Sequence, residues 1–126
     1  MLHPTQYSNV LSKKMKESNS QVFLVNTGWN GKGDRISLKD TRLIIDAIFN
    51  DDLNDIETET LPYFNLAIPK SLKSISADLL DPRKSWNTNA EWEIKAKELA
   101  QLFINNFQKF CDNDHGKRLL ASGPQL

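Results

Sequence analysis

The sequence predicts an α/β or α+β fold, with two or three short strands flanked by helices and a long amphipathic helix near the carboxy terminus. Apolar residues recur at helical spacing in three separate stretches. One short β-branched run, Val22–Val25, and proline-interrupted apolar pieces supply the strands. The 126 residues suffice for one modest domain, so residues 1–126 are treated as one unit.

The first half predicts helix, strand, glycine-rich loop and helix. Residues 5–16 carry apolar side chains at helical spacing. Val22–Val25 is short and bounded by turn-forming residues, which is typical of a buried strand. After the glycines, residues 35–37 could form another short strand. Ser37 can then cap a helix that carries Asp40 in its first turn and ends near residues 50–52.

The second half predicts irregular structure followed by one long helix. Pro62 and Pro69 confine any strand in "ETETLPYFNLAIP" to a sheet edge or a short bridge. Thr88 and Glu91 have the spacing of a capping box. The residues after them predict a helix with one continuous apolar face, made by Trp92, Ala96, Leu99, Phe103, Phe107 and Phe110. The tail to Leu126 is expected to be short and of variable order.

Composition narrows the functional classes. Sixteen basic residues balance sixteen acidic ones, so no overall charge attracts nucleic acid or an anionic membrane. No apolar run approaches membrane-spanning length, and the amino terminus lacks the apolar core of a signal peptide. Cys111 is the only cysteine, which excludes an internal disulfide and favours packing as a small hydrophobe. We therefore expect a cytoplasmic protein.

The stretch "LVNTGWNGKGDRISLKDTR" has the layout of a phosphate-binding loop but lacks its chemistry. Gly28 and Gly33 have the Walker spacing, yet Asp34 stands where the lysine must be and Arg35 where the hydroxyl must be. A carboxylate at that place would repel phosphate oxygens. The glycine pattern of dinucleotide-binding folds is not met either, so we reject phosphate binding by this loop.

Two interpretations of the loop remain. It can be a plain connection between strands, or it can present a surface to another body, as Trp29 within it suggests. Arg35 can stack its guanidinium on a ring, and Thr41 lies in the first turn of the next helix. Together these two side chains could receive a base rather than a phosphate.

The same stretch closely resembles the carboxy-terminal region of the ATP-dependent phosphoenolpyruvate carboxykinases. The resemblance extends to "LHPTQY", "LPYFNLAIP", "LLDPRKSW" and "KAKELAQLFINNFQKF", in the same order. It implies part of a gluconeogenic carboxy-lyase that converts oxaloacetate and ATP to phosphoenolpyruvate, ADP and CO₂, using Mg²⁺ with ATP and a second ion, usually Mn²⁺. The chain would then be the carboxy-terminal fragment of the nucleotide-binding domain.

The resemblance also implies site residues. Arg35 and Ile36 would border the adenine pocket, and Thr41 would close it. The family's phosphate loop, substrate arginine and metal ligands belong to the amino-terminal portion, which makes that portion a candidate partner. Asp34 departs from the basic residue that is frequent in the family.

The residues themselves offer no catalytic centre, and we assign no catalytic or metal-binding residue. His3 and His115 lack metal-ligand spacing, and carboxylate pairs such as Asp51–Asp52 lie in polar turns. We expect a chain that is inactive alone and exposes apolar surface. The alternatives are a stand-alone adenine-nucleotide-binding or protein-interaction module, and a subunit that an amino-terminal partner complements.

Overall fold

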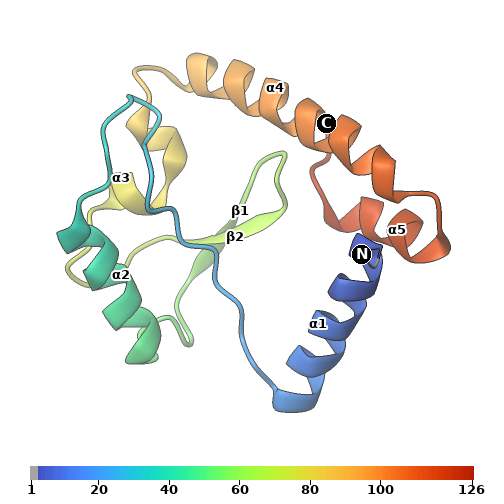
Figure 1. Ribbon diagram of the computed structural model, residues 1–126. Helices are drawn as coiled ribbons and strands as arrows, with labels where there is room; N and C mark the ends of the chain where they lie inside the picture. Colours follow the sequence, from blue (N-terminus) through green and yellow to red (C-terminus); the bar gives the residue numbers. More distant parts are fainter. Residues whose placement is uncertain (1–2) are drawn as a thin grey trace.

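A computed structural model describes residues 3–126 and shows helices arranged around a small antiparallel hairpin (Figure 1). Helix α4 runs along one side of the hairpin, with α2 and α3 toward one end and α1 and α5 toward the other. The mixture of helices and short strands agrees with the predicted α+β class. The elements are α1 (Pro4–Ser18), α2 (Leu38–Phe49), β1 (Thr58–Leu61), β2 (Leu66–Pro69), α3 (Ala77–Leu80), the 3₁₀ turn η1 (Pro82–Ser85), α4 (Asn89–Phe107), η2 (Gln108–Phe110), α5 (Asp114–Leu119) and η3 (Leu120–Ser122).

Side-chain caps start the helices where the sequence predicts them. The Ser37 hydroxyl accepts from the Asp40 amide at 3.1 Å, and the Thr88 hydroxyl accepts from the Glu91 amide at 3.2 Å. His3 also caps a helix, since its Nδ1 accepts from the Thr5 amide at the start of α1. These caps satisfy amides that the first helical turn leaves without a partner.

The predicted strand at Val22–Val25 is wrong. These residues are extended but belong to neither strand of the sheet, and Leu24 is 81% exposed. Within residues 3–126 a single sheet is formed, which pairs β1 with β2 from Thr58 opposite Pro69 to Leu61 opposite Leu66. An apolar run forms a buried strand only when neighbouring strands are present to pair with it. Nothing in residues 3–126 supplies that neighbour.

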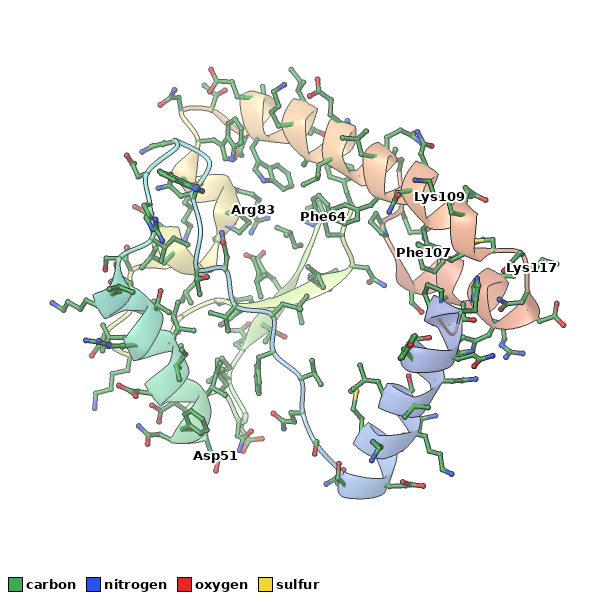
Figure 2. All side chains as sticks on the ribbon, in the orientation of Figure 1. Asp51, Phe64, Arg83, Phe107, Lys109 and Lys117 are labelled. Atoms are coloured by element: carbon green, nitrogen blue, oxygen red, sulfur yellow. The ribbon has the colours of Figure 1, made fainter. Side chains whose placement is uncertain are left out.

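The core is small and lies between the hairpin and the first half of α4. Leu61, Trp92 and Ala96 form its buried cluster, and Phe64 and Trp86 pack against it. Figure 2 shows Phe64 at the hairpin tip, on the side of α4. The predicted continuous apolar face of α4 is therefore covered only in part.

The second half of that face remains open. Leu99 is 47% exposed and Phe103 is 53% exposed, while Ala100 beside them is fully buried. The sequence pattern identified the apolar stripe but not how far along the helix its neighbours extend.

The tail is more regular than predicted. Residues beyond Asn113 form α5 and η3, and the Gln125 amide donates to the Tyr63 carbonyl at the hairpin tip, at 2.8 Å. His115 accepts or donates a bond with Ser8 of α1 at 3.0 Å. Cys111 is half-buried, and its thiol donates to the Phe107 carbonyl, as expected of a packed cysteine.

Arg83 in η1 joins the hairpin to the segment before α4. Its Nε donates to Asp81 Oδ1 at 2.8 Å and its Nη2 to Asp81 Oδ2 at 3.0 Å. Nη2 also donates to Glu59 of β1. Figure 2 shows the Arg83 side chain between η1 and the hairpin. Because Asp81 is buried, this paired geometry compensates for the loss of water around its carboxylate.

The network lowers the pKa of Asp81. Burial alone would raise this pKa, but bonds from the Arg83 side chain and amide, with the charges of Arg83 and Lys84, outweigh it. A carboxyl whose pKa is lower in the folded chain stabilises that chain above its unfolded pKa. This stability is lost as the pH falls below the ordinary value of 3.8 and through the folded pKa.

We expect Asp81→Asn to lower the free energy of unfolding by about 1–2 kcal/mol at neutral pH, because a charge-assisted pair with Arg83 is lost. The variant should also lose less stability than the wild type between about pH 7 and about pH 3. Urea unfolding at both pH values measures this, with the exposed Asp46→Asn of α2 as the matched control. Equal pH dependence of the wild type and Asp81→Asn would contradict the role of this carboxylate.

Candidate functional site

The glycine-rich loop closes on itself. Trp29 and Arg35 form an isolated antiparallel bridge, and the Ile36 amide donates to the Gly28 carbonyl at 2.9 Å. The Asn30 amide donates to the Asp34 carbonyl at 2.8 Å. Residues 35–37 thus contribute one bridge rather than the short strand that the sequence suggested.

Asn30 holds the tip of the loop. Its side-chain Oδ1 accepts from the amides of Lys32 and Asp34, at 3.0 and 2.8 Å, and its carbonyl accepts from the Gly33 amide. Gly33 has φ +84°, which favours glycine because a Cβ strains this backbone conformation. The three amides point onto Asn30, whereas a phosphate cradle would direct them at its ligand.

Arg35 lies over the exposed indole of Trp29. Its Cζ is 5.9 Å from the Trp29 ring centroid, and Trp29 is 63% exposed. This places the guanidinium within the range of a cation–π contact. A planar cation held on one ring can offer its outer face and its N–H groups to a second ring.

Ile36 and Thr41 lie on either side of the start of α2. Ile36 is half-buried, while Thr41 is half-buried in the first helical turn and its amide donates to the Ser37 carbonyl. Arg35 and Ile36 precede the capped helix start, and Thr41 lies after it, six positions from Arg35 and five from Ile36 in the sequence. Whether the three surround one ring stays a prediction.

A groove of about 730 Å³ lies beside the loop. It is surrounded by residues 22–26, by Trp29–Gly31 of the loop, by α2, by the hairpin and by the α3–η1 region, and its lining is mainly apolar. Ile36 is the predicted site residue that lines this groove; Arg35 and Thr41 lie outside its lining. Its volume is in the range of small-molecule sites.

Sequence reasoning missed the residues that anchor the loop. Ser85 Oγ accepts from the Gly31 amide at 3.1 Å, across 54 positions of the chain, and Trp86 packs against Gly31. The motif "LLDPRKSW" contains both residues, but nothing in its pattern states which loop they contact.

Within residues 3–126 there is no group of three or more His, Cys, Asp or Glu side chains that could hold a metal ion. The helices in this part of the chain are too short or too polar to span a bilayer.

We expect Asn30→Ala to open the tip of the loop, because the amides of Lys32 and Asp34 lose their acceptor. Trypsin should then cleave after Lys32 about five- to tenfold faster, since cleavage of a locally opened segment follows the population of the open form. Asn105→Ala, which removes an exposed amide from α4, is the control. Unchanged cleavage in Asn30→Ala would show that the side chain does not order the loop.

Comparison with known proteins assigns the chain to a family. Residues 1–78 match the model of the family described as phosphoenolpyruvate carboxykinase, in its ATP-dependent form. The match covers more than half of the 126 residues and includes the loop, Arg35, Ile36 and Thr41. The motifs beyond residue 78 lie outside this match. The chain therefore belongs to the ATP-dependent phosphoenolpyruvate carboxykinase family.

Proposed function

We propose that this chain is the carboxy-terminal part of a phosphoenolpyruvate carboxykinase and supplies the adenine side of its ATP site. The observation that carries the proposal is the family match across the segment that contains Arg35, Ile36 and Thr41. In the complete enzyme this site serves the conversion of oxaloacetate and ATP to phosphoenolpyruvate, ADP and CO₂ in gluconeogenesis. We assign the chain to the cytoplasm on the same basis.

The local geometry gives each residue a role in this proposal. Arg35, resting on Trp29, offers a planar cation to the face of the purine. Ile36 offers apolar surface, and Thr41 offers a hydroxyl at the edge of the ring. None of these contacts reaches a phosphate. The free chain should therefore bind ATP weakly and with little preference over adenosine, because a purine alone provides few atoms for affinity.

The metal chemistry belongs elsewhere in this proposal. The Mg²⁺ and Mn²⁺ of the family neutralise charge during phosphoryl transfer when they are bound. Residues 3–126 contain no group of three or more His, Cys, Asp or Glu side chains that could hold either ion, and we propose that the metal ligands lie in the amino-terminal portion. The contribution of this chain is to place the purine end of ATP.

The open apolar surface supports an amino-terminal partner. Val22 and Leu24 are exposed and line the apolar groove, and the segment that carries them has no strand neighbour in the described part of the chain. A continuous exposed apolar surface of this kind is typical of a contact with further polypeptide. We propose that this polypeptide is the amino-terminal portion of the enzyme, which also holds the phosphate loop and the metal ligands.

We expect Arg35→Gln and Thr41→Val each to weaken ATP binding about three- to tenfold, because each removes one contact to the base. Isothermal titration with ATP and with adenosine measures this. Arg118→Gln on α5 is the matched control, since it removes the same charge far from the loop in sequence. ATP that binds much more tightly than adenosine would contradict the assignment, because it would mean that this chain holds phosphates.

We further expect the purified chain to form no phosphoenolpyruvate from oxaloacetate, ATP and Mn²⁺. Addition of a separately expressed amino-terminal portion of a family member should restore turnover, and Arg35→Gln should reduce the restored rate. Turnover by the chain alone would refute the proposal. Tight, saturable ATP binding without complementation would favour a stand-alone nucleotide-binding module.

A further inference from the structure

The glycine-rich loop is attached to the rest of the molecule through η1. The Gly31 amide donates to Ser85 Oγ at 3.1 Å, and the Ser85 hydroxyl donates to the Pro82 carbonyl at 2.8 Å. Ser85 is only 4% exposed. Its single hydroxyl thus links the loop amide to the backbone of η1, in a place where water cannot easily replace it.

Trp86 fixes the distance of the loop from η1. A Cβ added to Gly31 would lie 2.2 Å from Nε1 of the Trp86 indole, well inside van der Waals contact. Only glycine allows this approach without displacing the ring. Trp86 also packs on the core cluster around Leu61 and Trp92. The same ring therefore contacts both the core and the loop, and it fixes the loop relative to the core.

The anchor itself is held by charged groups. Arg83, two residues before Ser85, is paired with Asp81 and with Glu59 of β1. A continuous series of contacts therefore leads from the hairpin through η1 to Gly31. Trp29 and Arg35 lie on the loop on either side of that point.

We propose that Ser85 and Trp86 are positioning residues for the adenine side of the site. They set the place of the glycine-rich loop, residues 28–35, so that Trp29 and Arg35 are ordered before the nucleotide binds. This inference rests on the proposed function for its ligand, and on the contacts of Gly31 for its mechanism. Preordering of this kind raises affinity because less conformational freedom is lost on binding.

The direct test is hydrogen exchange at the Gly31 amide of the full chain, without nucleotide. In Ser85→Ala this amide should exchange about tenfold faster, because its acceptor is gone, and ATP binding should weaken about three- to tenfold. The unfolding midpoint should fall only modestly, because the hydrogen bonds of one side chain are lost while the rest of the core is kept. Ser85→Thr, which keeps the hydroxyl, should restore both protection and affinity.

Ser18→Ala is the control, because the Ser18 hydroxyl also donates to a backbone carbonyl at 2.8 Å but lies at the end of α1. Wild-type protection and affinity in Ser85→Ala would overturn the proposal. A wild-type chain that binds no adenine nucleotide would instead contradict the proposed function. Exchange at Gly31 then decides by itself whether Ser85 positions the loop.

A second pair of variants keeps the test valid if Ser85→Ala unfolds the chain. Gly31→Ala should speed exchange across residues 28–35 and weaken ATP binding, because the new methyl group meets the indole. In a Trp86→Ala background the same substitution should have less than half that effect, since the ring is absent. Equal effects of Gly31→Ala in the two backgrounds would overturn the role of Trp86.

Discussion

The ion pairs of Arg83 constrain the rest of the molecule. One guanidinium binds the buried Asp81 and reaches Glu59 of β1, so the hairpin, the end of α3 and η1 share a single polar junction. The free-energy cost of burying Asp81 stays small only while its cation remains in place, because a buried carboxylate without a cation is strongly unfavourable. Removal of any one partner therefore disturbs three elements together.

This junction matters because the apolar core is too small to fix the arrangement alone. No large side chain among residues 3–126 is completely buried, and the exposed apolar residues include Leu24, Phe49 and Leu102. A structure with so few buried apolar side chains depends on polar links between its elements. Much of its apolar surface remains exposed to water. The proposed contact with the amino-terminal portion would use that surface, and would complete the nucleotide site in the same step.

The sequence predicted features that depend on neighbouring residues. Ser37 and Thr88 cap their helices as expected, because a cap involves groups three positions apart. The strand at Val22–Val25 was wrong because pairing requires a distant partner that local pattern cannot supply. Helix α5 was missed because its six residues lack a recognisable apolar period, and the contacts that hold it are distant in sequence: its cap Asn113 bonds Thr5 across 108 positions, and His115 bonds Ser8 across 107.

In the candidate site, too, residues within one continuous stretch could be predicted, whereas residues distant in the sequence could not. Arg35, Ile36 and Thr41 were identified from one continuous stretch, through its resemblance to the family, and the matched range contains them. The anchor of that stretch, Ser85 with Trp86, could not be found in this way because it lies 54 positions from Gly31. A glycine in such a loop suggests positive φ or close approach, and the two causes differ here: Gly33 has φ +84°, whereas Gly31 faces an indole ring. The close approach of the Trp86 ring is thus sufficient to explain the glycine at position 31.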